Sequence, residues 1–491
     1  MEDMRQLPLL FLFLLLSGCM VGPRYREPEI SLPGKFEEID GFGEVADDLS
    51  EWWKRFNDPL LDGFIAEALR GNFDLRLAVE RIEQARAQYR VEKSHLWPEI
   101  DLNAMAVRSR LSQNLLPTQD SLSGGPGLFS SLLNIFQVGF DAIWELDFFG
   151  KFRHAKRAAY YSWEAMREDA ETVLISMTSE VVVTYINIRA LQKKIELMKK
   201  RIGADERELA IMQSLYEIGL DNELQVMMLI SSIETDRAAL PVLETSFKQS
   251  VYALAYLLGR QPEGLLDQFL EIGPIPSGSG KVPVGLPSDL LRRRPDVRSA
   301  ERQLAAATEQ VGAAVADLFP RIALTGISLG AANRPGSSIG LEGSELNDVF
   351  KAASRTFSVG ANLNWNLIDF GGVRGKIDEK NSLQRQALLT YEQTVISSLK
   401  DVESALVAYF EEEKRRNSFL QKVEADARSL QITEDLYEIG IVNEIQVLNA
   451  QKNLLASESS FVESEQAFSG DLVALYKALG GSWTSVKSEQ E

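Results

Sequence analysis

Hydrophobic residues recur at alternating steps of three and four along one long stretch of the chain, a pattern typical of helices that supercoil around a neighbour. This seam runs from residue 174 to residue 216 and is apolar except at Thr184 and Asp205; its members are Leu174, Met177, Val181, Thr184, Ile188, Leu191, Ile195, Met198, Ile202, Asp205, Leu209, Met212 and Tyr216. The pattern predicts a helix from about Lys151 to Tyr216, roughly 100 Å long at 1.5 Å per residue. A less regular seam covers residues 395–430.

Two other segments alternate strictly between apolar and polar residues, which predicts strands with one face of each kind. They are 136–147 and 357–367, and the segments 100–110 and 321–331 alternate less cleanly. Loops rich in Gly, Ser, Asn and Pro separate the members of each pair, at Ser112–Leu133 and Ala332–Arg355. We therefore expect one long-looped hairpin in each half of the chain, with four strands in all.

The two halves are copies of one plan. Residues 215–226 and 436–447 lie 221 positions apart and agree at nine of twelve positions. Each stretch predicts the tip of a helical hairpin, because glycine ends one helix and Asn-Glu opens the next. We expect residues 1–18 to be a signal peptide, 19–50 an extended N-terminal arm, 51–259 the first repeat, 260–288 a linker and equatorial segment, 289–480 the second repeat and 481–491 a tail.

Composition excludes several functions. The chain has 491 residues and a net charge of −19, which argues against a nucleic-acid partner. Its two histidines, His95 and His154, accompany no nucleophile motif, carboxylate pair or metal-ligand spacing, so we expect no enzyme, metal site or cofactor. Residues 278–281 read Gly-Ser-Gly-Lys but lack the other residues of a phosphate-binding loop.

The only cysteine lies at the end of a short apolar run. Leu7–Leu16 has the length of a signal-peptide core, and the Leu-Ser-Gly-Cys that ends at Cys19 resembles a bacterial lipobox. That resemblance implies a lipidated N-terminus at Cys19 and sorting to the outer membrane. The alternative is a free cysteine inside an ordinary signal peptide.

An apolar face on four strands would be an aggregation hazard in water. In lipid a sheet survives only as a closed barrel, and barrels of four strands are too small to close. Several copies must then share one barrel, with polar side chains lining its lumen; these are Gln137, Asp141, Asn362 and Asn364. Aromatic residues near the helix–strand junctions would form the interfacial girdle. The alternative is a soluble antiparallel sheet with an aromatic core.

Several motifs resemble those of the outer membrane factors, the TolC-like efflux proteins of Gram-negative bacteria. They are Cys19–Tyr25, Trp52–Leu60, Leu286–Val297 and Leu448–Leu454, and they occur in order along nearly the whole mature chain. The resemblance implies a mixed α and β membrane protein: a homotrimer with a shared transmembrane β-barrel of four strands per protomer and a periplasmic barrel of long helices. It also implies an exit duct that an inner-membrane pump and a periplasmic adaptor supply, anchored by lipid in the outer membrane.

The same resemblance assigns roles to the hairpin tips. The adaptor would dock on Ile218, Gly219 and Leu220 and on Ile439, Gly440 and Ile441, although both glycines would also serve as simple helix caps. A periplasmic gate maps onto Ile445 and Asn449, with Leu224 and Met228 as first-repeat equivalents. Asn449 would alternatively pack between helices. Because these residues are uncharged, we expect a closed channel that is only weakly sensitive to pH between about 4 and 7.

Two other functions stay open from the residues alone. One is a structural coiled-coil lipoprotein of the outer membrane without a pore, and the other is the same duct serving type I protein secretion. Drugs, metals, solvents and proteins all remain possible cargo.

Overall fold

The computed structural model describes residues 20–37, 51–110, 132–278, 287–325, 337–357 and 359–481. They divide into two compact units. The first contains Met1–Glu27, Gln84–Glu164 and Arg302–Leu389, and the second contains Pro28–Glu83, Ala165–Glu301 and Thr390–Glu491. Cys19 and residues 279–281 lie outside the described residues, so the structure does not test their predictions.

The helices repeat as the sequence predicts. In the first half they are η1 (Trp52–Phe56), α2 (Pro59–Gly71), α3 (Phe73–Ser94), α4 (Lys151–Glu217), α5 (Glu223–Leu257) and η4 (Leu266–Phe269). In the second half they are α6 (Pro287–Arg293), α7 (Pro295–Ala316), η5 (Ala352–Ser354), α8 (Gly372–Glu438) and α9 (Glu444–Ala478). The copies match in length: α4 and α8 have 67 residues each, and α5 and α9 have 35 each.

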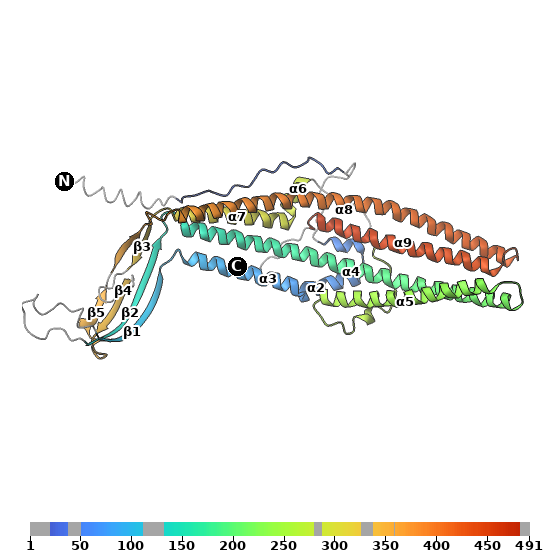
Figure 1. Cartoon of the computed structure of the whole chain (residues 1–491), viewed down its shortest axis with the longest axis horizontal. Coiled ribbons are helices and arrows are strands. Elements are labelled where there is room, and N and C mark those ends of the chain that lie inside the picture. The colour runs from blue at the N-terminus through green and yellow to red at the C-terminus, as the bar shows by residue number, and fades with distance from the viewer. Residues whose placement is uncertain are drawn as a thin grey trace, which may run out of the picture. The chain divides into compact units, whose positions relative to one another are not determined.

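The strands lie together in the first unit (Figure 1). They are β1 (Glu99–Arg110), β2 (Leu132–Leu146), β3 (Arg321–Thr325), β4 (Ser337–Gly343), β5 (Arg355–Phe357) and β6 (Gly360–Asn364). All the pairings are antiparallel, with β1 against β2, β2 against both β3 and β4, β3 against β6 and β4 against β5.

Six strands replace the four predicted ones. They nevertheless form four lines in the sheet, where a line is one strand or two strands that follow one another end to end. The register explains why: Ile143 of β2 pairs with Thr325, and its neighbour Ala142 pairs with Ser337. Strands β3 and β4 therefore continue one another along the same edge of β2. Strands β5 and β6 likewise follow one another, against β4 and β3. The expected loop Ala332–Arg355 is thus partly wrong, because its residues 337–343 form β4. Glycine is depleted in strands, and the two glycines of β4 therefore argue against a strand when the sequence is considered alone.

Similar hydrogen bonds form at the strand–helix junction of each repeat. The indole nitrogen of Trp144 donates to the carbonyl of Leu96 at 3.1 Å, and that of Trp365 donates to the carbonyl of Leu318 at the same distance. The carboxylate of Asp147 accepts from the backbone amides of residues 152 and 153, and that of Asp369 accepts from those of residues 371 and 373. These aspartates cap the first turns of α4 and α8, where the helix dipole favours negative charge.

The hydrophobic core lies in the second unit, where η1, α2, η4 and α6 pack among the long helices. Trp52 stacks on Tyr476 of α9 at 5.2 Å, and Phe64 of α2 stacks on Phe269 at 5.8 Å. One described helix, α4, contains a stretch apolar enough to cross a membrane by length and composition, and 67% of that stretch is buried inside the protein. Burial of this kind is typical of a core helix.

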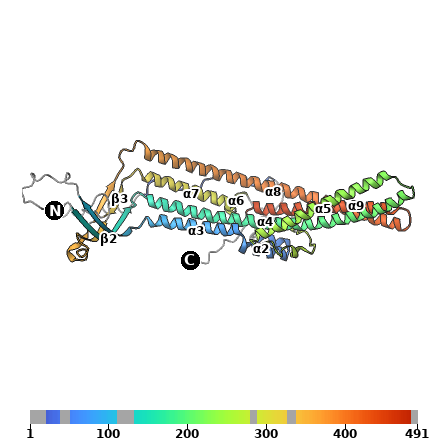
Figure 2. The ribbon, with the colours of Figure 1, turned by 60° about the horizontal axis from the view of Figure 1, so that its bottom comes forward.

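In the second unit the hairpins α4–α5 and α8–α9 run side by side (Figures 1 and 2). The predicted seam of α4 is buried at Leu174, Val181 and Ile188, whereas Tyr216 at its end is 45% exposed. The seam therefore packs against other helices of the same chain except near the tip.

Candidate functional site

The two hairpin tips have the same backbone and the same caps. Gly219 and Gly440 adopt φ of 76° and 75°, the left-handed region that ends a helix with glycine. At the first tip the amide of Leu220 donates to the carbonyl of Leu215 at 2.9 Å, and Ile441 donates to Leu436 at the same distance in the second. The side chains of Asn222 and Asn443 then accept from the amides three residues on, each at 3.1 Å, and open α5 and α9.

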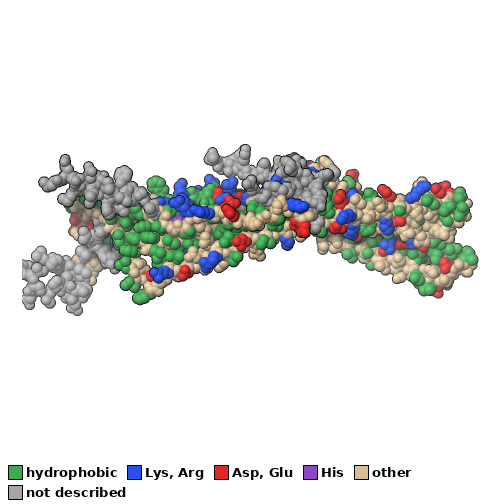
Figure 3. All heavy atoms as spheres, turned by 90° about the horizontal axis from the view of Figure 1, so that it is seen from above, with side chains coloured by type: hydrophobic (Ala, Val, Ile, Leu, Met, Phe, Trp, Pro, Cys, Tyr) green, Lys and Arg blue, Asp and Glu red, His purple; other side chains and the backbone are tan. Residues whose placement is uncertain are grey.

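Both tips expose apolar side chains. Ile218, Leu220, Ile439 and Ile441 are between 67% and 73% exposed, and hydrophobic side chains gather at this end of the hairpins in a space-filling view (Figure 3). A Cβ atom added to either glycine would meet nothing within 4 Å. The tips therefore present an open apolar surface, as a docking site requires.

The residues assigned to the gate lie just after the tips. Asn449 is exposed and Ile445 is half-buried, one turn earlier on α9. Their first-repeat equivalents, Leu224 and Met228, are 66% and 60% exposed on α5. These four side chains are thus accessible in the described chain, and Asn449 does not pack between its helices.

Close to Asn449, a charged cluster joins α9 to α4. The ammonium of Lys452 lies 3.2 Å from the carboxylate of Asp205 and also donates to Glu208, both on α4. Asp205 is 2% exposed, so its charge lies inside the helical packing. Burial lowers the pKa of Lys452, but the bonds to Glu208 and Asp205 outweigh it and leave that pKa above its ordinary value.

The sequence analysis missed this cluster, although a signal was present. Asp205 occupies an otherwise apolar seam, where a carboxylate needs a cationic partner. The partner is 247 residues further along the chain, and the sequence alone does not identify it.

The sheet has one apolar and one polar face, because its register aligns residues of a kind. On the apolar face Leu102 is opposite Phe140, and Phe140 is opposite Ile339. These three side chains are 65%, 56% and 64% exposed. Further members of that face, all at least 36% exposed, are Ile100, Val138, Trp144, Leu324 and Leu363.

The other face carries the residues predicted to line a lumen. Asn103 donates to the carboxylate of Asp141, and Gln137 is opposite Glu342. Asn362 and Asn364 are exposed on β6. The wall of a membrane barrel requires such a sheet, with an apolar face toward lipid and a polar face toward the lumen.

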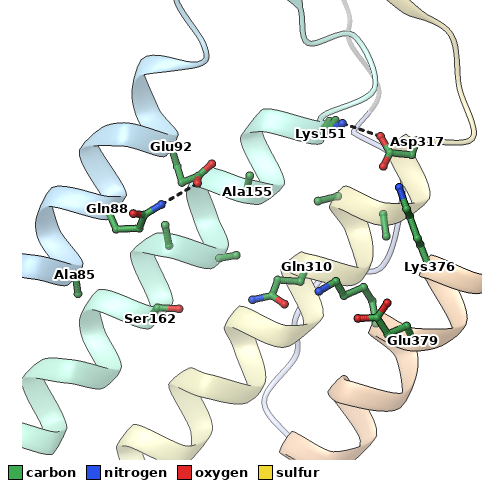
Figure 4. A pocket seen from close by; sticks show the side chains of 15 residues that line it. Ala85, Gln88, Glu92, Lys151, Ala155, Ser162, Gln310, Asp317, Lys376 and Glu379 are labelled. Atoms are coloured by element: carbon green, nitrogen blue, oxygen red, sulfur yellow. Dashed lines mark hydrogen bonds and ion pairs between the residues drawn. The ribbon is translucent and has the colours of Figure 1, made fainter. Parts of the chain in front are cut away.

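The first unit also contains an open groove of about 610 Å³ between α3, α4, α7 and α8 (Figure 4). Alanines line its floor, and charged side chains surround it, with Lys151 bound to Asp317 at 2.8 Å. Across the described part of the chain no group of His, Cys, Asp and Glu could hold a metal ion.

Comparison with known proteins places this architecture in a family. A family model described as outer membrane efflux protein matches residues 64–260 and 286–481, which confirms the internal duplication. The solvent efflux pump outer membrane protein SrpC of Pseudomonas putida is 30% identical over 98% of both chains. The pyoverdine export outer membrane protein OpmQ of Pseudomonas aeruginosa is 29% identical, again over 98% of both.

Solved structures agree with the sequence relatives. The outer-membrane channel OprN superposes with a TM-score of 0.79 and 28% identity, over 95% of this chain and all of that one. Together with the paired repeats, long helices and two-faced sheet, these matches show that the chain belongs to the outer membrane efflux protein family and is the outer-membrane component of an efflux pump.

Proposed function

We propose that the chain is the exit duct of a tripartite efflux system, in which three copies share one barrel. The observation that carries this proposal is the open, two-faced sheet. Its four lines leave outer strand edges without a partner within the described chain. Membrane barrels need about eight strands or more, so one copy is too few, and three copies supply about twelve lines.

The duct would conduct passively. The relatives are named for solvents and for pyoverdine, which differ greatly in polarity and size. This chain is similar to both relatives over 98% of its length. Cargo would therefore be chosen by the inner-membrane pump and passed on by a periplasmic adaptor.

The adaptor would dock on the hairpin tips at Ile218–Leu220 and Ile439–Ile441. Two observations support docking at this surface. The apolar side chains of the tips are exposed, and the space next to Gly219 and Gly440 is free of other atoms of the described chain. The gate would be formed by rings of Ile445 and Asn449, with Leu224 and Met228 packed around them. The side chains Gln137, Asp141, Asn362 and Asn364 would line the barrel lumen.

A lipid anchor would complete the assembly. In this proposal residues 1–18 are removed as a signal peptide and Cys19 is acylated, with residues 19–50 as the arm. The repeats 51–259 and 289–480 then supply one hairpin of strands and one of helices each, joined by residues 260–288.

The central test is the assembly and its conductance. Protein purified from outer membranes in mild detergent should have the mass of three copies and should form channels in planar bilayers. A monomer without conductance would refute the shared barrel and would favour a structural lipoprotein.

Docking is tested separately with Leu220→Asp and Ile441→Asp combined. A charge on each exposed tip should abolish crosslinking to the adaptor and reduce efflux at least tenfold, because the apolar contact would bury it. Leu270→Asp is the control, since Leu270 in the linker is 77% exposed and lies away from both tips in sequence. Unchanged crosslinking in the double variant would place docking elsewhere.

A further inference from the structure

The chain binds its own N-terminal arm at the strand–helix junction of the first unit. The amide of Val21 donates to the carbonyl of Phe149 at 3.1 Å. The carbonyl of Val21 accepts from Nε2 of His154 at 2.7 Å, so both backbone groups of this residue are bound. Four residues further on, the ring of Tyr25 packs against that of Tyr161 at 6.1 Å.

A buried carboxylate orients the ring of His154 toward the carbonyl of Val21. Its other ring nitrogen, Nδ1, lies 2.5 Å from the carboxylate of Glu309 on α7. His154 and Glu309 are 1% and 2% exposed, so water does not compete for either bond. Since the carbonyl of Val21 only accepts, Nε2 must carry a hydrogen, and Glu309 fixes the ring that presents it.

Glycines let the arm approach this closely. Gly22 has φ of 106°, and a Cβ atom there would lie 2.7 Å from Cα of Gly312. A Cβ at Gly312 would lie 2.3 Å from the His154 ring, and one at Gly150 would lie 2.6 Å from the side chain of Met20. Cβ atoms essentially never lie within 3.0 Å of another heavy atom, so any side chain larger than hydrogen at these glycines would displace the arm or the ring.

The internal duplication does not repeat this arrangement at the corresponding positions. Helices α3 and α7 correspond at an offset of 222, which matches Glu309 to Ala87 and Gly312 to Arg90. His154 corresponds to Gly375 or Lys376. The duplicated scaffold therefore folds without these residues, and their presence at one junction only matches the presence of one arm.

We infer that Phe149, Gly150, His154, Glu309 and Gly312 form an arm dock, a binding site for Met20–Gly22 of the same chain. The dock joins α4 of the first repeat to α7 of the second through the arm. Met20, the first described residue of the arm, lies against Gly150, next in sequence to Phe149. The ring of Phe149 stacks on that of Phe319, and their centroids lie 4.7 Å apart. Aromatic rings of this kind mark the level of the membrane interface. Because Cys19 directly precedes Met20 in the sequence, the dock would bring an acyl chain on Cys19 to the bilayer at this level, a role that rests on the proposed lipid anchor.

Hydrogen exchange on the full-length protein tests the dock directly. The Val21 amide should be protected in the wild type, and Gly22→Val should speed its exchange at least tenfold, because the arm can no longer approach Gly312. The change lies in the arm, so the helices keep their packing. Gly34→Val is the matched control, since a Cβ at Gly34 meets nothing within 4 Å.

Two substitutions of Glu309 separate hydrogen bonding from packing. Glu309→Gln should keep Val21 protected, because an amide can donate to Nδ1 while Nε2 still donates to Val21. Glu309→Leu has a similar volume but should lose the protection. An unprotected Val21 in the wild type, or equal protection in wild type and Gly22→Val, would overturn the dock.

Labelling with a fatty acid in the same cells distinguishes the two proposals. Label that persists in Cys19→Ala would refute the lipid anchor and would leave the exchange result for the dock intact. Label that depends on Cys19, together with unchanged exchange in Gly22→Val, would refute the dock alone.

Discussion

Replacing Lys452 with methionine should loosen the two helical hairpins where they meet. The substitution keeps most of the side-chain volume and removes the charge that faces Asp205 and Glu208. Asp205 would then keep a buried carboxylate without a counter-ion, since its side chain is only 3% exposed. Its Oδ2 atom already lacks a hydrogen-bond partner among the described residues.

The size of the effect follows from distance and burial. At 3.2 Å and an effective dielectric constant of about 20, the attraction between Lys452 and Asp205 is roughly 5 kcal/mol before desolvation. Breaking a fully buried pair costs about 3–5 kcal/mol. Because the Lys452 side chain is 23% exposed, we expect a smaller loss, roughly 2–4 kcal/mol, in the local opening free energy.

Hydrogen exchange provides the assay, because unfolding of a large membrane assembly is irreversible. A loss of that size corresponds to exchange about 30- to 700-fold faster for amides of α9 near Lys452 and of α4 near Asp205. Asp205→Asn combined with Lys452→Met should recover part of the loss, since the double variant no longer buries the Asp205 charge and only that of Glu208 stays without Lys452.

The matched control is Lys422→Met on α8. Lys422 pairs with Asp426 one turn away at 2.8 Å, but its side chain is 52% exposed. Exposed pairs of this kind contribute about 1 kcal/mol or less, so exchange should rise less than about fivefold. If Lys452→Met had no larger effect than Lys422→Met, the contacts of Lys452 with Asp205 and Glu208 would not hold the hairpins together. Purely additive effects of Asp205→Asn and Lys452→Met would lead to the same conclusion.

Three further outcomes follow from the same structure. The difference in stability between wild type and Lys452→Met should stay constant from about pH 7 to 10 and should decline only above about pH 10. The pKa of Lys452 is raised in the folded state, so its contribution to stability is lost as the pH rises through that folded-state pKa. Rates of thermal inactivation measured across this pH range test the prediction. Ile445→Ala with Asn449→Ser should raise resting conductance and antibiotic entry, and a double variant that conducts like wild type would place the constriction elsewhere. Arg189→Met should lower the free energy of local opening at the linker by about 2–4 kcal/mol, because the buried guanidinium donates to Gln192 and to the carbonyl of Glu271. Proteolysis of the linker near residue 271 should therefore accelerate. Equal cleavage of variant and wild type would mean that other contacts hold the linker.

The regular elements were predictable because their causes are local. Steps of three and four identified α4, and alternation identified β2, since each period reflects the geometry of a single element. The tips were predictable from glycine and asparagine, which act on neighbouring backbone groups. Strand β4 was not, because its residues Ser337–Gly343 include two serines and two glycines and owe their conformation to pairing with β2.

The interactions between distant residues show where sequence reasoning ends. His154 was noted only as one of two histidines and was excluded as a catalyst, yet it is buried between a carboxylate 155 residues away and a carbonyl 133 residues away. Nothing about its neighbours in the sequence indicates either partner, because the partners are set by how α7 and the arm return to α4. What the sequence does contain is the asymmetry between repeats. A buried histidine, an acid and a glycine interrupt the correspondence between the copies, and in a duplicated chain such departures are where a function of one copy is most usefully sought.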